Sequence, residues 1–379
     1  MSRLLVVEDS PTQAKRLALI LQDAGFDVET APDADRGFAR LAEQPFDLVL
    51  SDLLLPGDSG FDLCRRIKAE PRLRHVPVVV TDVYGFAPRV VLHGLPGGPV
   101  DVSGDHCPVS LRPLLVGMRL GSKDALPPDP ARQLSLEICP ADPASAPLAR
   151  LALRPAGIVP LKHDALHLFE PDCTANRCVP LPTLWLRYLL AWQHDRTAAK
   201  RGDALRMSPR DLRALNAYYI VPRPVFLVGV AHEGQENLFP MDLVGALSSG
   251  EYLLALRSTS PSVALMEASR HIAMSSAPAA QLQAVYALGK QHHLSALDLS
   301  TLTVPVARSP LFGLPVLEQD GLMRELFVER VERIGSHALF VTRIEREAGH
   351  AGRQLAHMSG MYAEWLRRER QACEVLAPL

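Results

Sequence analysis

The sequence has little net charge and lacks any long apolar run. Its 40 Lys and Arg residues nearly balance its 42 Asp and Glu residues. Such a balance gives no electric field that would hold a polyanion, and there is no local basic patch, so we expect no nucleic-acid binding. No uncharged run approaches membrane-spanning length. The amino terminus, MSRLLVVEDS, turns acidic too early for a secretory signal, so we expect a cytoplasmic protein.

Cysteines are few and scattered. They stand at positions 64, 107, 139, 173, 178 and 373, without the dense, even spacing of a disulfide framework, so we expect reduced thiols. Only Cys173 and Cys178 lie close together, and a zinc site needs a second pair at similar spacing. A loop is the better interpretation of this stretch.

The chain is long enough for two cores. Its 379 residues exceed an ordinary single domain, and a composition of 47% hydrophobic and 22% charged residues suits a globular protein. We expect a first domain over residues 1–120 and a second over 151–379. Residues 121–150 are rich in Pro, Ala, Ser and Asp, which predicts a linker containing one strand, QLSLEI.

Residues 3–81 alternate two kinds of signal. Short apolar runs, namely RLLVVED, FDVETA, FDLVLSD and VPVVVTD, are separated by amphipathic stretches of helical length. The clearest helix has Ser10 as its N-cap and Pro11 in its first turn, and it ends before Gly25. Nearly all-apolar strands joined by helices predict an α/β doubly wound parallel sheet, covered on both faces.

Acidic side chains stand at the ends of these strands. Glu8 and Asp9 end the first strand, Asp52 ends the third, and Thr81 ends the fourth. The functional crevice of such a sheet lies at the carboxyl ends of its strands, so these residues should converge on one edge. Like charges this close repel one another unless a cation lies among them, and an all-oxygen site with open positions suits Mg²⁺.

These segments resemble the receiver domain of two-component response regulators, which has a flavodoxin-like fold. The resemblance runs from LLVVEDSPTQAKRLALILQDAGF through DLVLSDLLLPGDSGFDLCRRIKAEPRLRHVPVVVTD. It implies that Asp52 is the phosphoacceptor, that Glu8 and Asp9 bind Mg²⁺ together with Asp52, and that a sensor histidine kinase is the partner. Thr81 is then the hydroxyl that meets the phosphoryl group. The alternative is an acid-lined loop edge without phosphorylation.

The resemblance deteriorates after Thr81. The family places a small residue next and, further on, a Lys followed by Pro at the end of a fifth strand. Here Asp82 follows, and VYGFAPRVVLHGLPGGPVDVSGDHCP contains no Lys. In that family the Lys normally supplies a charge that responds to phosphorylation. The present sequence therefore does not imply that phosphorylation would switch the domain between two states. Two accounts stay open: VLHGLPGGPVDV is a damaged fourth helix and fifth strand, or the receiver is truncated near residue 83 and joined to unrelated sequence.

From about residue 150 onward, long strands dominate the pattern. YYIVPRPVFLVGVAHEGQEN is typical of a strand that enters a polar turn, and GEYLLALRSTSPSVALMEASRHIAMSSA of a strand, a helix and a strand. LMRELFVERVERIGSHALFVTRIERE predicts a hairpin through Gly335 and Ser336. Several long antiparallel strands with few helices predict a closed barrel.

The junction RSTSPS, at residues 257–262, joins one of these strands to a helix. Ser260 caps the helix and Pro261 lies in its first turn. The first N–H groups of a helix have no intrahelical partner. Next to them, Arg257 supplies a guanidinium, and Ser258, Thr259 and Ser262 supply three further hydroxyls. This is a phosphate-binding arrangement. Simple capping is the alternative, since Ser-Pro begins many helices that bind nothing.

Residues 215–345 resemble the flavin reductase-like family of FMN-binding split barrels, through YIVPRPVFLVGV, ENLFPMDLVG and the RSTSPS segment. The resemblance implies a mainly antiparallel β split barrel with flanking helices, and a homodimer formed through it with FMN at the interface. The implied FMN contacts are Asn237, Pro240, Met241 and Asp242 for the ring, and Arg257, Ser258, Thr259, Ser260 and Ser262 for the phosphate. One departure is that the ring-facing position is often a small hydroxyl residue, whereas Met241 and Asp242 are larger.

Reduction of FMN by NAD(P)H needs no acid or base from the protein, because hydride passes directly between stacked rings. No catalytic triad is therefore expected, and we interpret His292 and His293 as part of a solvated loop. The leading hypothesis is a receiver fused to a domain that reduces flavin with NAD(P)H. In the alternative, the second domain binds flavin or another ligand without turnover and serves as a signalling output. In a third reading, both domains have structural roles only.

Overall fold

The chain folds into two compact units, Met1–Phe86 and Ala87–Leu379. The computed structural model describes residues 2–9, 11–52, 55, 60–81, 88–121, 133–140, 145–200, 207–278, 281–291, 293–302, 304–318, 321–349 and 354–368. Within these residues, no helix is both long and apolar enough to cross a membrane.

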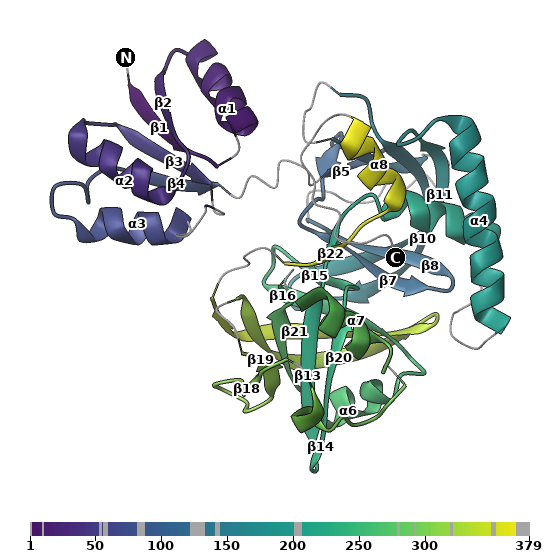
Figure 1. Cartoon of the computed structure of the whole chain (residues 1–379). Helices are drawn as coiled ribbons and strands as arrows, with labels where there is room; N and C mark the ends of the chain where they lie inside the picture. The colour runs from purple at the N-terminus through teal and green to yellow at the C-terminus, as the bar shows by residue number, and fades with distance from the viewer. Residues whose placement is uncertain are drawn as a thin grey trace. The chain divides into compact units, whose positions relative to one another are not determined.

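The first unit is a parallel sheet between helices, as the sequence predicts (Figure 1). The strand order is β2-β1-β3-β4, with β1 (Arg3–Val7), β2 (Asp27–Ala31), β3 (Leu48–Asp52) and β4 (Val78–Thr81). Helix α1 (Pro11–Asp23) covers one face, and α2 (Ala34–Glu43) and α3 (Gly60–Ala69) cover the other. The core joins β1 and β3 to α2 and α3 through Leu5, Val7, Val49, Leu41, Leu63 and Ile67.

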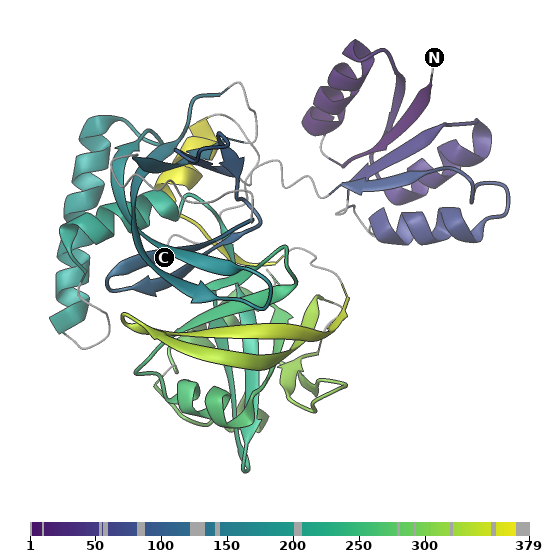
Figure 2. The same ribbon diagram turned by 180° about the vertical axis from the view of Figure 1, so that it is seen from behind.

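The second unit begins with an antiparallel sheet of order β6-β5-β9-β10-β11-β8-β7. Its strands are β5 (Arg89–His93), β6 (Val100–Asp101), β7 (His106–Leu111), β8 (Leu114–Leu120), β9 (Leu134–Cys139), β10 (Ala149–Pro160) and β11 (Ala165–Asn176). Two helices follow, α4 (Leu181–Lys200) and α5 (Pro209–Tyr218), and they lie along the outer side of this sheet (Figure 2).

This sheet does not follow the expected domain boundaries. The sequence predicts that residues 89–120 belong to the first domain, yet residues 89–120 supply β5 to β8 of the second unit. The expected linker at 121–150 does contain a strand close to QLSLEI, which is β9. That strand lies inside the sheet, because Leu136 pairs with Leu92 of β5 on one side and with Leu151 of β10 on the other.

A second antiparallel sheet, of order β14-β13-β17-β20-β21-β16-β15, curls into a half-barrel. Its strands are β13 (Phe226–His232), β14 (Gln235–Met241), β15 (Val244–Ala246), β16 (Glu251–Arg257), β17 (His271–Ser276), β20 (Met323–Ile334) and β21 (His337–Ala348). In this strand order β14 and β15 are the edges, which corresponds to a split rather than a closed barrel. The expected hairpin through Gly335 and Ser336 joins β20 to β21.

Short elements surround the half-barrel. Two pairs of strands form small ladders, β12 (Arg223–Pro224) with β22 (Ala356–His357), and β18 (Val306–Arg308) with β19 (Pro315–Leu317). The helical elements are α6 (Pro261–Ser269), α7 (Leu282–Gly289), the 3₁₀ turn η2 (Leu299–Thr301) and α8 (Gly360–Arg368). Helix α6 follows β16 directly, so the RSTSPS segment does join a strand to a helix.

The two sheets of the second unit share one apolar core. Cys107, Val109 and Leu166 of the first sheet cluster with Leu253 and Leu339 of the second. Glycine allows the sheets to approach here, since a Cβ on Gly245 would lie 2.8 Å from the Cβ of Cys107. The first sheet is therefore an integral part of the split-barrel unit.

Candidate functional sites

The strand register of the first unit brings the predicted phosphorylation residues to one edge of the sheet. Val7 pairs with Ser51, and Asp52 pairs with Thr81, so β1, β3 and β4 end side by side. Glu8 follows β1 directly, and its N–H donates to the Ala31 carbonyl at 2.9 Å. The backbone thus places Glu8, Asp9, Asp52 and Thr81 together, while the side chains of Asp52 and Thr81 lie outside the described part.

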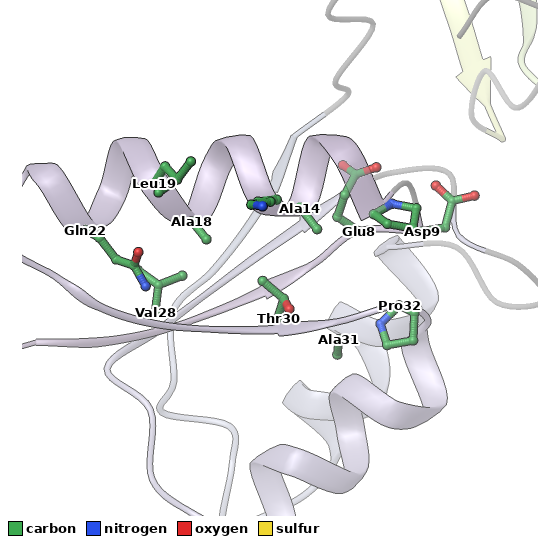
Figure 3. A pocket seen from close by; sticks show the side chains of 12 residues that line it. Glu8, Asp9, Ala14, Ala18, Leu19, Gln22, Val28, Thr30, Ala31 and Pro32 are labelled. Carbon is green, nitrogen blue, oxygen red and sulfur yellow. The ribbon is translucent and has the colours of Figure 1, made fainter.

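The two adjacent carboxylates occupy the mouth of a cleft between α1 and β2 (Figure 3). The cleft encloses about 510 Å³ and is lined along its length by Ala14, Ala18 and Val28. Glu8 is only 2% exposed, whereas Asp9 is half-buried. A buried carboxylate next to a second one is a costly arrangement, which a cation placed between them would relieve.

The donor set suits a hard cation. Glu8, Asp9 and Asp52 offer carboxylate oxygens only, which are the ligands that Mg²⁺ prefers. Among the side chains that the structure describes, no three His, Cys, Asp or Glu residues are grouped to hold a metal ion. The predicted metal ligands are Glu8, Asp9 and Asp52, and the side chain of Asp52 is not among the described side chains. The residues present therefore fit Mg²⁺ by chemistry and by backbone placement.

The described part of the first sheet ends with β4, and this decides between the two accounts of the sequence after Thr81. Arg89–His93 forms β5, which pairs with β9 and β6 in the second unit. The account in which VLHGLPGGPVDV is a damaged helix and fifth strand of the first sheet is therefore wrong. The chain agrees instead with a receiver truncated near residue 83, because residues 89–93 pair with strands of another core.

In the second unit, one hydrogen bond joins the two predicted flavin-binding segments. The Nδ2 of Asn237 in β14 donates to the Oγ of Ser262 at 3.0 Å and to the carbonyl of Leu294 at 3.1 Å. Asn237 and Ser262 are each 2% exposed. Because both side chains are engaged and buried, they fix the strand against α6 rather than face a ligand.

The RSTSPS segment presents the remaining predicted hydroxyls at the start of α6. Ser260 is the N-cap, as predicted, but its side chain makes no capping hydrogen bond. Ser258 and Thr259 are exposed. Burial, followed by the charge of the nearby Arg257, lowers the pKa of His337 to about 4. The start of α6 thus follows directly on Arg257 and on three hydroxyl residues, Ser258, Thr259 and Ser260, which suits an anion.

The predicted ring-facing segment is engaged within the protein. Met241 is 5% exposed and belongs to the apolar core of the half-barrel. Asp242 accepts from Arg223 at 2.5 Å and from His357 Nδ1 at 2.8 Å. Burial opposes the ionisation of Asp242, but the His357 hydrogen bond and the Arg223 charge outweigh it and hold the pKa of this carboxyl below its ordinary value.

The partners of Asp242 were not predicted as site residues. Arg223 stands in the Arg-Pro-Val stretch that carries the resemblance, and its guanidinium lies 3.4 Å from the centre of the Tyr219 ring. His357 reaches the site because β22 pairs with β12, a contact with no local signal in the sequence. The predicted phosphate-binding residues therefore fit FMN better than the predicted ring-binding residues do. Of the ring-binding residues, the half-buried Pro240 is the candidate that remains.

Comparisons with known proteins match the first unit. Residues 4–89 match the family model of the response regulator receiver domain. The chain is 36% identical over 101 residues to response regulator PleD of Caulobacter vibrioides, covering 26% of this chain and 22% of that protein. It is 38% identical over 99 residues to the DNA-binding response regulator MtrA of Mycolicibacterium smegmatis, covering 26% and 42%. The chain thus spans less than half the length of either relative.

Solved structures similar to the chain include an FMN-binding protein from Thermus thermophilus, 25% identical, covering 34% of this chain and 72% of that one, with a TM-score of 0.31. The strand order of the second unit by itself identifies an antiparallel split barrel. The first unit is a receiver domain of the response-regulator type, joined to an antiparallel split-barrel unit.

Proposed function

We propose that this is a two-component signalling protein whose receiver domain takes a phosphoryl group on Asp52 from a sensor histidine kinase. The observation that supports the proposal is the register that ends β1, β3 and β4 side by side. A carboxylate oxygen of Asp52 attacks phosphorus while the N–P bond of the phosphohistidine breaks. Glu8, Asp9 and Asp52 would hold Mg²⁺, which supplies neutralisation of the phosphate charge. Thr81 would donate its hydroxyl to the bound phosphoryl group.

Phosphorylation is tested with acetyl phosphate and Mg²⁺, followed by mass spectrometry of the intact chain. We expect one added phosphoryl group on the full chain and none on Asp52→Ala. The matched control is Asp23→Asn at the exposed end of α1, which should be labelled like the unsubstituted chain. Labelling of Asp52→Ala to the same extent would contradict the assignment.

For the second unit, we propose binding of FMN through its phosphate at residues 257–262. The exposed Ser258 and Thr259, the uncapped hydroxyl of Ser260 and the start of α6 support this placement. Bound FMN would supply hydride acceptance from NAD(P)H. The chain itself would position the phosphate and exclude water. A homodimer through the split barrel, as the family resemblance implies, is part of the proposal.

Binding without turnover is the second candidate, and the state of Asp242 favours it. This carboxylate is held by Arg223 and His357, and Met241 lies in the core, so neither side chain is available to a flavin ring. In that case the second unit would be a ligand-binding output of the receiver, without chemistry.

Colour separates these candidates. A purified yellow protein whose flavin absorbance bleaches on addition of NADH or NADPH without oxygen indicates a reductase, and yellow protein that does not bleach indicates binding alone. We expect Arg257→Ala to lower the flavin content at least tenfold, because the phosphate loses a charged partner. Arg154→Ala, at an exposed position of β10, is the matched control. Colourless protein that takes up no added FMN would contradict both candidates.

A further inference from the structure

Helix α4 is apolar around most of its circumference, but the described part of the chain covers only one side of it. Leu184 and Tyr188 pack inward and are 6% and 9% exposed. The opposite side, called the α4 face below, consists of Leu181 at 67% exposure, Trp185 at 61%, Leu186 at 55%, Leu189 at 49% and Leu190 at 54%. A helix that is apolar all round is normally buried on all sides.

The α4 face is unusual within the described part of the molecule. Other large apolar side chains that are exposed, such as Leu19 of α1 and Leu311, do not gather in this way on one helix. Single exposed apolar residues need no explanation, whereas a contiguous patch of this kind marks an interaction site. The geometry of one helix guarantees contiguity here, because Leu181, Trp185 and Leu189 follow one another at intervals of one turn.

Charge argues for an apolar partner. Between Leu181 and Gln193 the sequence contains one charged residue, Arg187. Its guanidinium pairs with Glu364 of α8 at 2.5 Å. A partner that is recognised by its charges, such as an acidic peptide, would therefore find little to pair with on the α4 face. A second α4 face is itself apolar and meets this requirement.

We propose that α4 pairs with α4 of a second copy of this chain, antiparallel across a two-fold axis near Trp185 and Leu186. A self-complementary patch is what a two-fold interface needs. Near this axis, Trp185 and Leu186 of one copy approach the same two residues of the other copy. If each large apolar side chain has an accessible area of roughly 150–250 Å², the exposed fractions of the α4 face amount to about 500 Å² for each copy. Two copies would then bury at most about 1,000 Å² in total, which is the least that a biological interface needs and less than the roughly 1,200 Å² of a stable one.

The interface is tested by the molar mass of the full chain in sedimentation equilibrium at micromolar concentration. The double variant Leu186→Glu/Leu190→Glu should halve the mass, whatever other interface the chain uses. Both side chains are more than half exposed, so the variant should keep its circular dichroism spectrum. Leu19→Glu, an exposed leucine on α1, is the matched control and should leave the mass unchanged.

A covalent readout makes the test independent of affinity. Leu186→Cys lies near the proposed axis, so mild oxidation should give a dimer on a non-reducing gel that Leu19→Cys and the unsubstituted chain do not give. A full chain that is already monomeric overturns the proposal, and binding of that monomer to phosphatidylcholine vesicles would identify a lipid surface as the occupant instead. An unchanged mass in the double variant together with no crosslink overturns it as well.

Discussion

At the scale of single residues, the buried histidine beside the RSTSPS segment makes stability depend on pH. His337 is 1% exposed, and its pKa of about 4 lies below the ordinary value of 6.5. Because the histidine pKa is lower in the folded chain, the unfolded chain takes up the proton at a higher pH as the solution is acidified. The contribution to stability is therefore complete above about pH 6.5 and is lost as the pH falls toward 4.

We expect the free energy of unfolding to fall between pH 7 and pH 5 by roughly 2 kcal/mol through His337 alone, since each pH unit below the unfolded pKa costs about 1.4 kcal/mol. Burial lowers the pKa of His106 to about 4 too, so it acts in the same direction. Urea unfolding of His337→Gln at both pH values should show a smaller difference than the unsubstituted chain. The control variant His163→Gln, at an exposed position, should show the same difference between the two pH values as the unsubstituted chain. An equal pH dependence in all three chains would contradict this expectation.

Asp242 and Arg223 form a second residue-scale test. The guanidinium of Arg223 is 9% exposed in the folded chain and depends on Asp242 for its charge partner. Asp242→Ala should lower the free energy of unfolding by about 3 kcal/mol, because it leaves a buried cation unpaired. Glu345→Ala removes a partner of the exposed Arg343 and should cost much less, because solvent screens an exposed ion pair. Urea titration at pH 7 measures both, and equal losses would contradict the assigned role of burial.

At the scale of elements, the approach of β19 to the half-barrel depends on one glycine. A Cβ built on Gly229 of β13 would lie 1.7 Å from the carbonyl oxygen of Pro315, which is backbone and cannot turn aside. Gly229→Ala should therefore push β19 away and destabilise the fold by about 3 kcal/mol. Gly157→Ala in β10 is the control, because its Cβ would meet nothing closer than Leu168 at 3.7 Å. Thermal unfolding distinguishes the two, and equal stability of both variants would refute the close approach.

The helix at the carboxyl terminus shows how element boundaries depend on packing. Helical spacing of Leu355, Met358, Tyr362 and Trp365 predicts one amphipathic helix, but α8 begins at Gly360, and His357 lies in β22. In this strand His357 pairs with Arg223 of β12. Tyr362, which is 1% exposed, packs within the same chain.

At the scale of the whole molecule, the position of the domain boundary has a direct consequence. The core shared by the two sheets of the second unit draws its residues from position 107 onward. A fragment of residues 87–379 should therefore be soluble and unfold cooperatively in differential scanning calorimetry. A fragment of residues 151–379, cut at the boundary that composition suggests, loses β5 to β9 and should aggregate. Cooperative unfolding of the shorter fragment would contradict the described core.

The sequence alone determined the parallel sheet of the first unit and the gathering of acids at its edge. Each βα step is local, and chain direction sends every parallel strand to the same edge, so Glu8, Asp52 and Thr81 could be placed without coordinates. Their pattern needs no knowledge of distant residues.

Only the tertiary structure decided the rest. Residues 89–139 look like a damaged receiver and a linker until β5 and β9 are seen paired beside β10. His357 meets Asp242 across a long stretch of chain. In antiparallel sheets, the choice of neighbouring strand depends on which apolar faces meet and how deeply they are buried. Neither property can be predicted from the local residue pattern of a strand.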